Sequence, residues 1–333
     1  MWWQQTSKDS DVAVSTRVRF ARNITGYKFP NMMSQKESEA IIEKVNNSID
    51  KKQYELFKLK DIDEVNRYSL IEQHLISKEF VENIENGAIV VNKDYSIVAM
   101  INEEDHLRIQ SFESGLNINT CYNNLLKFTN DLENKLSFAT NDDYGYITAC
   151  PTNIGSGMRV SVMLHLPALA KLGYLSSLLE QVSNMGVAVR GLYGENTTGY
   201  GDMYQISNQE TLGEYDSEII SKVKAVVLSI IEQERKARNV LQKNSIKLED
   251  EIYRTYGVLK NARLLSEKEA IQYLSLLRLG VAMNIVPNIS LDKVQSLIIQ
   301  SSTNTLKTLL KKNLEDEYEE NEKRAEYIRK EID

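Results

Sequence analysis

Two short apolar runs separated by a polar turn stand out in the first third of the chain. They cover residues 88–91 and 96–100, with the turn at 92–94. Runs of this length bounded by turn residues are typical of a β-hairpin. The second run leads directly into three consecutive carboxylates at 103–105, and another strand-like run follows at 109–112. The pattern therefore predicts an acidic loop between strands of one sheet.

Capping signals and alternation predict further elements on both sides of this hairpin. Ser34 and Glu37 form a capping box, which predicts an amphipathic helix to about Ile49. Arg17 and Arg19 are two positions apart, so in a strand both side chains lie on one face. The remaining predicted elements are a helical stretch before His74, a helix at 114–136, strands at 144–148 and 158–165, a helix from Pro167 to about Met185, and a strand at 187–190 before a glycine-rich loop at 191–201.

Beyond Asn208 the apolar positions change to helical spacing, which continues almost to the end of the chain. The first of these helices carries the i,i+4 pairs Glu232–Lys236 and Glu234–Arg238. We therefore expect two domains, a mixed domain at 1–245 and a helical domain at 246–333.

Composition narrows the possible functions. The 333 residues are 42% hydrophobic and 26% charged, which is ordinary for a globular protein with ample core. The net charge of −7 argues against direct nucleic-acid binding. No apolar run approaches the ~18 residues of a membrane span, and the first residues lack a signal-peptide core, so we expect a cytoplasmic protein without membrane contact. Two cysteines and three histidines argue against a disulfide framework or a protein metal site.

Several polar features have ordinary structural explanations on pattern alone. The acidic triplet can be a solvated turn, and the strand with Arg17 and Arg19 can be a charged edge strand. A single His74 is more often packed than a ligand, and Cys150 before Pro151 is most often a small buried hydrophobe. We interpret Cys121 as a core residue. The adjacent Trp2 and Trp3 fit either a packed staple or an exposed contact.

Four longer sequence motifs, taken together, are not accounted for by these structural explanations. They are Ser-Thr-Arg-Val-Arg-Phe-Ala-Arg at 15–22, Asn-Glu-Glu-Asp-His-Leu-Arg at 102–108, Cys-Pro-Thr-Asn-Ile-Gly-Ser-Gly at 150–157 and Arg-Gly-Leu-Tyr-Gly-Glu at 190–195. In this order they resemble the motifs of the phosphagen (guanidino) kinases, the creatine and arginine kinase family. The strings at 165–167 and 205–208, and the long helical C-terminal region, are most similar to the bacterial protein-arginine kinase branch.

The resemblance implies an α+β fold, in which a central, mainly antiparallel sheet flanked by helices is followed by an all-α C-terminal domain. It also implies ATP-dependent phosphorylation of a guanidinium group. Such a group has a pKa of about 13.8 and arrives protonated, so carboxylates must align it and draw off a proton. By resemblance these are Glu104, as the base, and Glu195, with Cys150 touching the guanidinium.

Nucleotide binding is likewise assigned by resemblance. The implied ATP-binding residues are Ser15, Thr16, Arg17, Val18, Arg19, His74, Arg108, Arg159, Val160, Ser161, Val162, Met163, Arg190, Gly191, Leu192, Tyr193, Gly194 and Glu195. Mg²⁺ would be held chiefly by the nucleotide and water, so we expect no protein metal ligand. Neither a Walker-A string nor the catalytic-loop string of eukaryotic-type kinases is present.

The same branch implies partners. Its substrates are proteins that present arginine, among them the class III heat-shock repressor and unfolded proteins marked for the Clp ATPase–protease. A zinc-binding activator protein stimulates the kinase, and the helical region suggests a homodimer. Some members carry an Arg-Asp-x-x-Arg-Ala motif that binds phosphoarginine, but here only Arg324 and Ala325 match and Glu320 takes the place of the first arginine. We therefore expect weak or absent phosphoarginine feedback.

Two other interpretations stay open. One is a small-molecule guanidino kinase acting on free arginine. Kinases of that kind carry a helical domain before the first arginine motif, whereas fourteen residues precede Ser15 here. The other is a non-catalytic adaptor, against which the presence of Glu104, Glu195 and the five arginines argues.

Overall fold

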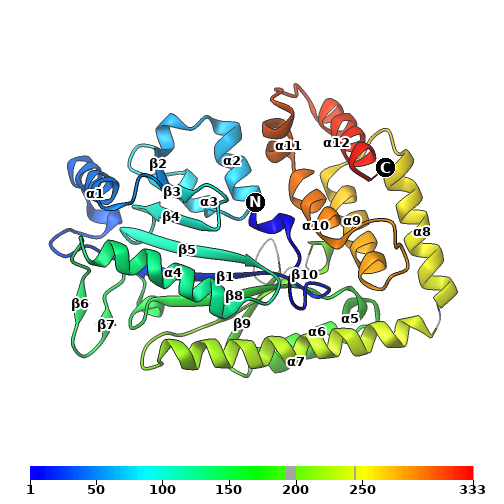
Figure 1. The fold of residues 1–333 in the computed structure, drawn as a ribbon, viewed down its shortest axis with the longest axis horizontal. Coiled ribbons are helices and arrows are strands. Elements are labelled where there is room, and N and C mark those ends of the chain that lie inside the picture. The colour runs from blue at the N-terminus through cyan, green and yellow to red at the C-terminus, as the bar shows by residue number, and fades with distance from the viewer. Residues whose placement is uncertain (192–199, 244, 333) are drawn as a thin grey trace.

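The structure is a computed structural model that describes residues 1–191, 200–243 and 245–332. Within these residues a large antiparallel sheet of eight strands forms the centre of the molecule (Figure 1). Its order across the sheet is β2 (Tyr54–Lys58), β3 (Ala88–Asn92), β4 (Ile97–Ile101), β5 (Leu107–Ser114), β1 (Ala13–Arg22), β8 (Met158–His165), β10 (Met203–Asn208) and β9 (Val187–Gly191). This arrangement confirms the expected mainly antiparallel α+β fold.

One face of the sheet is covered by helices. Figure 1 shows α4 (Ile118–Glu133) and α7 (Asp216–Gln242) lying along it, and α1 (Gln35–Ser48) packs beside α4. Alternate strand residues such as Val18, Ile109 and Val162 point to this side and join one buried apolar cluster. Cys121 of α4 is buried in the same cluster, as expected, and burial raises the pKa of its thiol to about 12.

The described residues cover the opposite face only in part. Near β3, β4 and β5 it is sealed by the 3-10 helix Trp2–Gln4, by α2 (Glu64–Glu72) and by α3 (Lys78–Val81). Trp2 and Trp3 belong to the buried cluster there, together with Met100 and Phe112. Trp2 stacks on Phe112 with ring centroids 5.2 Å apart. The two tryptophans are therefore packed, which decides between the two interpretations of the pair.

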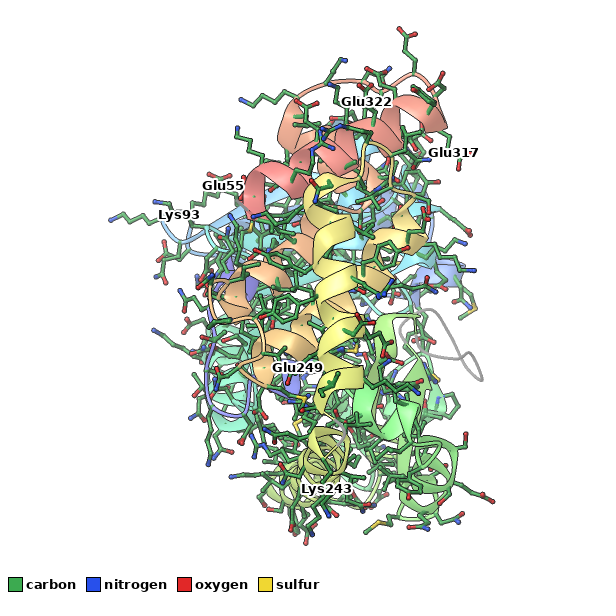
Figure 2. All side chains as sticks on the ribbon, turned by 90° about the vertical axis from the view of Figure 1, so that its right-hand side faces the viewer. Glu55, Lys93, Lys243, Glu249, Glu317 and Glu322 are labelled. Carbon is green, nitrogen blue, oxygen red and sulfur yellow. The ribbon has the colours of Figure 1, made fainter. Side chains whose placement is uncertain are left out.

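The C-terminal region consists of helices around a core of their own. They are α8 (Ser245–Asn261), α9 (Glu267–Ala282), α10 (Leu291–Gln300), α11 (Thr303–Leu310) and α12 (Glu317–Ile332). Figure 2 shows α8 along the outer side, with Lys243 and Glu249 toward one end of the view and Glu317 and Glu322 of α12 at the other. On the inner side α10 packs against the 3-10 helix Trp2–Gln4, and α11 packs against α2.

Most locally encoded elements are where the sequence predicts them. The hairpin is β3–β4, and the Ser34–Glu37 capping box begins α1. The predicted pair Glu232–Lys236 forms at 2.7 Å on the surface. Glu234–Arg238 forms as well, at 2.9 Å, but it is buried, and Glu234 also accepts hydrogen bonds from backbone N–H groups at the start of α5 (Pro167–Lys171).

Other predictions need correction. The single helix from Pro167 to Met185 is wrong: α5 ends at Lys171 and α6 (Leu175–Ser183) follows, because Gly173 has a φ of +72° that a helix does not accept. The strand at 144–148 is only β7 (Gly145–Tyr146), paired with β6 (Thr140–Asn141). The helix at 114–136 is shorter, because β5 continues to Ser114.

The edge-strand interpretation of Arg17 and Arg19 is also wrong, because β1 lies between β5 and β8 in the middle of the sheet. Strand β2 had no counterpart among the predicted elements. Among the described residues, no helix is both long and apolar enough to span a bilayer.

Candidate active site

A row of arginines lies on the partly open face of the sheet. Arg19 is directly opposite Arg159 of β8, and Arg108 of β5 is opposite Ala21, on the same face as Arg19. Arg17 is opposite Ser161, and Arg190 of β9 is opposite Gln205 of β10, which has the same facing. Side chains of alternate residues share a face, so four strands bring all five arginines to one side of the sheet.

Like charges act on one another within this row, because Arg17 and Arg19 both lie near Arg108 and Arg159. Arg17 donates hydrogen bonds to Ser161 Oγ (3.3 Å) and to Gln205 Oε1 (3.0 Å). Burial and nearby Arg108 and Arg159 lower the pKa of Arg17 to about 10. Arg19 is 7% exposed, and its Nε has no hydrogen-bond partner in the described part of the chain. Burial and Arg108 hold the pKa of Arg19 well below its usual range. A polyanion would relieve this repulsion and satisfy the unpaired donor.

The acidic loop between β4 and β5 has a fixed backbone. Asn102 has a φ of +61°, and its N–H donates to His106 O at 3.0 Å. The His106 ring accepts from the N–H of Ile24 at Nδ1 (2.9 Å), so its proton lies on Nε2, 2.7 Å from Lys28 O. Burial lowers the pKa of His106. His106 therefore anchors the loop as a neutral ring and takes no direct part in chemistry.

The three carboxylates of the loop differ in their surroundings. Glu103 accepts hydrogen bonds from Arg108 and from Ser77 Oγ, both at 2.6 Å. Asp105 is 2% exposed and accepts from Asn23 Nδ2 and a backbone N–H. Glu104 is exposed. Partial burial and the neighbouring Asp105 and Glu103 carboxylates raise the pKa of Glu104, which suits a group that has to accept a proton.

Glu104 shares a surface hollow with the segment that carries Cys150. The hollow is lined by Pro30, Asn31, Asn83, Glu103, Glu104 and Ala149. Cys150 follows Ala149 directly and is half-buried, with its Sγ 3.1 Å from Thr152 Oγ1. The hollow has two carboxylates, Glu103 and Glu104, in its lining, which suits a cationic guanidinium.

A cavity lies at the other end of the arginine row. Its walls include Ser15, Arg17, His74, Ser161 and Met163, all of which the sequence assigned to nucleotide binding. From Ser15 to Ala21 a strand spans roughly 20 Å at about 3.3 Å per residue. The order along β1 is thus cavity, arginines, acidic loop, which matches the order of base, phosphates and acceptor in a phosphoryl transfer.

The remaining predicted site residues lie elsewhere. Thr16, Val18, Val160 and Val162 are buried on the helix-covered face, so their side chains support the sheet and do not reach the arginine row. Gly191 ends β9. Leu192, Tyr193, Gly194 and Glu195 lie outside the described residues.

Sequence reasoning missed several supporting residues. Gln205 and Ser77 hold Arg17 and Glu103, and Asn23 holds Asp105. Gln205 alternates with apolar neighbours in β10, a pattern that could have indicated a strand with its polar face toward the site.

Comparisons with known proteins identify the family of the chain. Residues 33–237 match the family model described as ATP:guanido phosphotransferase, C-terminal catalytic domain. The chain belongs to this family. Residues 245–333 match a second model, described as the protein-arginine kinase McsB C-terminal domain.

Individual relatives of this guanido phosphotransferase cover nearly the whole chain. A protein-arginine kinase from Clostridium acetobutylicum is 39% identical over 337 residues, with 99% of each chain covered. Another from Caldanaerobacter subterraneus subsp. tengcongensis is 39% identical, with 96% of each chain covered.

Solved structures match about 70% of the chain. The substrate-free duplicated taurocyamine kinase from Schistosoma mansoni is 27% identical with a TM-score of 0.58, covering 69% of this chain and 35% of that one. The chain thus spans about a third of that duplicated protein. Lombricine kinase is 23% identical with a TM-score of 0.59 and covers 70% of each chain, which supports the fold.

Proposed function

We propose that this family member is an ATP-dependent kinase that phosphorylates the guanidinium group of arginine residues in proteins. The observation that carries the proposal is the row of five arginines on one sheet face, which ends at the hollow with Glu104. Near-full-length similarity to proteins named protein-arginine kinase supports the choice of acceptor.

The arginines would position the triphosphate and neutralise charge. Phosphoryl transfer spreads negative charge over the equatorial oxygens, and catalysis is mainly placement plus cations. The unpaired Nε of Arg19 would donate to a phosphate oxygen, and Arg108, held by Glu103, would approach from the acceptor side. Glu104 would align the incoming guanidinium and accept its proton as the N–P bond forms.

Further roles rest on the family resemblance. Glu195 would be the second carboxylate on the guanidinium, and Cys150 would touch it. Mg²⁺ would arrive bound to the nucleotide and be held chiefly by the nucleotide and water. Magnesium would supply added charge neutralisation between the phosphates.

The organisation and partners belong to the same proposal. A domain boundary near residue 245 is supported by separate apolar cores on its two sides. By resemblance, the protein would be a homodimer in the cytoplasm. Its partners would be a zinc-binding activator, the class III heat-shock repressor and the Clp ATPase. Kinase action on free arginine is the second candidate, since the carboxylates that line the hollow, Glu103 and Glu104, would face the same guanidinium group in either acceptor.

The test measures transfer of the labelled phosphoryl group from γ-labelled ATP in the presence of Mg²⁺. Two acceptors are compared in parallel, free L-arginine and a basic unfolded protein. We expect acid-labile, base-tolerant label on the protein only, because an N–P bond hydrolyses in acid. Label on free arginine would identify the small-molecule kinase. ATP binding without label on either acceptor, with or without an added activator, would favour the adaptor.

A further inference from the structure

The third arginine of the motif at 15–22 does not join the arginine row. Arg22 is the last residue of β1, and its side chain lies on the same side as Phe20, because alternate residues of a strand share a face. The Arg22 guanidinium carbon is 4.5 Å from the centroid of the Phe20 ring and 3.5 Å from that of the Tyr146 ring. Arg22 therefore lies on the helix-covered face, away from the phosphates that Arg19 would bind.

Arg22 and the residue after it hold both ends of the segment that carries Cys150. Arg22 Nη1 donates to Ser156 O at 2.9 Å, and Asn23 Nδ2 donates to Ile147 O at 3.0 Å. The same Asn23 nitrogen donates to a carboxylate of the acidic loop at 2.6 Å. The end of β1 thus joins the Cys150 segment to the acidic loop.

The turn at Gly157 leaves room for the Arg22 guanidinium. Gly157 has a φ of +63°, and a Cβ at this position would lie 2.7 Å from Arg22 Nη1. The Gly157 carbonyl accepts from the N–H of Ala21 at 2.9 Å, which keeps the turn beside β1. A guanidinium can donate from its edge while its face packs on aromatic rings, which the ammonium of a lysine cannot do.

We propose that Arg22 is a positioning residue for the guanidinium acceptor, because it fixes the Cys150 segment against the acidic loop. The inference rests on the proposed function. Ala149 of this segment and Glu104 of the acidic loop line the same hollow, so a shift of the segment changes the space in which an acceptor lies. Small displacements of groups that align a substrate lower the rate strongly. The arginine row on the opposite face stays in place, so nucleotide binding does not depend on Arg22.

The kinetic test compares Arg22→Met with Arg254→Met. Arg254 is an exposed arginine of α8 that pairs with Asp250, which makes it a matched control. We expect Arg22→Met to raise the KM for a protein acceptor by about tenfold or more, as the loss of one charged hydrogen bond supplies. ADP affinity, measured by calorimetry, should stay unchanged. Arg22→Lys keeps the charge and one donor and should be milder. Weaker ADP binding at an unchanged acceptor KM would overturn the proposal.

The reactivity of the two cysteines gives a readout that does not depend on catalysis. Cys121 is buried, whereas Cys150 is partly exposed. In Arg22→Met a disulfide-type thiol reagent should modify Cys150 about tenfold faster or more, by the same loss of one charged hydrogen bond. Cys150→Ser identifies which signal belongs to Cys150. The rate at Cys121 should not change, because a general loss of stability would expose both thiols.

A second variant keeps the test decisive if Arg22→Met does not fold. Tyr146→Leu removes one of the two rings beside the guanidinium and leaves the donors of Arg22 in place, so it should change the Cys150 rate in the same direction. Unchanged Cys150 reactivity and acceptor KM in the folded variants would overturn the proposal. If the unmodified chain transfers no phosphoryl group, the proposed function fails, whereas the Cys150 rates still decide whether Arg22 holds the segment.

Discussion

Asp105 Oδ1 accepts a hydrogen bond from the backbone N–H of Ala149 at 2.7 Å, and this bond joins the acidic loop to the segment carrying Cys150. The same oxygen accepts from Asn23 Nδ2 at 2.6 Å. Asp105 is the most buried of the three consecutive carboxylates, and its hydrogen bonds fix the position of the loop. The exposed Glu104 can then contact the guanidinium group of a substrate. Asp105 is a positioning residue in this arrangement.

Replacing Asp105 with Ala should lower both the stability of the fold and the affinity of the site for its acceptor. Two buried N–H donors lose their acceptor, which costs about 1–3 kcal/mol each at most sites. We expect urea denaturation to show reduced stability and the acceptor KM to rise. Asp105→Asn keeps one acceptor oxygen and should be milder. Asp142→Ala, on the exposed β6–β7 turn, is the control, and equal effects from both alanine variants would contradict the assignment.

Replacing Glu104 with Gln should remove the proton acceptor while retaining the shape of the loop. Loss of a general base typically lowers kcat by about 10²–10⁴-fold. ADP affinity should stay unchanged, because the arginine row is intact. The exposed Glu79→Gln on α3 is the control. Retained turnover in Glu104→Gln would exclude this residue as the base.

The pH profile should carry the signature of the same carboxylate. Partial burial and its two acidic neighbours raise the pKa of Glu104, and the base works only when ionised. As the pH falls, kcat/KM should therefore decline through a pKa above the ordinary glutamate value of 4.5. Steady-state rates of the folded enzyme across acid pH measure this. An acid limb at or below 4.5 would argue against Glu104.

A buried histidine should make stability depend on pH near neutrality. His165 Nδ1 lies 2.9 Å from Arg278 Nη1, which can only donate, and Nε2 lies 2.9 Å from Ser275 Oγ. Burial and Arg278 hold the pKa of His165 well below its usual range, so the folded state keeps the ring neutral. The unfolded chain takes up this proton below a pKa of about 6.5. The free energy of unfolding is therefore highest above about pH 6.5. It decreases as the pH falls below this value, by about 1.4 kcal/mol per pH unit.

The variant His165→Gln isolates this effect. A glutamine amide can accept from Arg278 and donate to Ser275, but it does not titrate. Urea unfolding between pH 7.5 and 5.5 should show a shallower loss of stability in the variant than in the native chain. Parallel curves for the two proteins would mean that His165 is protonated in the folded state.

The C-terminal motif should not sense phosphoarginine. Arg324 is 1% exposed and donates to Ser301 O (2.8 Å) and Leu265 O (2.9 Å), while Glu320 pairs with Lys307 at 2.6 Å. We expect free phosphoarginine to leave kinase activity unchanged. Arg324→Ala should lower stability by about 2–4 kcal/mol, because buried carbonyls lose their donor. A response to phosphoarginine that disappears in Arg324→Ala would contradict this.

The sequence by itself determined the elements whose signals are local. The β3–β4 hairpin follows from two apolar runs and a polar turn, α1 from its capping box, and α7 from apolar residues at helical spacing. Each of these depends on neighbours within a few positions, which the chain order already specifies. The four motifs predicted the family, which the family model over residues 33–237 confirms, and with it the proposed roles of Glu104 and the arginines.

The tertiary structure decided how distant segments meet. The register that sets Arg19 opposite Arg159 and the bond from Ala149 to Asp105 join residues far apart in the chain. So does the cavity that brings Trp2 to Gln295 of α10. The alternation of residues in a strand predicts which side chains share a face. It does not predict which strand lies next to that strand, because strand pairing is fixed by packing of the whole sheet against its helices. For that reason the arginine row could be anticipated residue by residue, whereas the helix that closes the cavity at its far end could not.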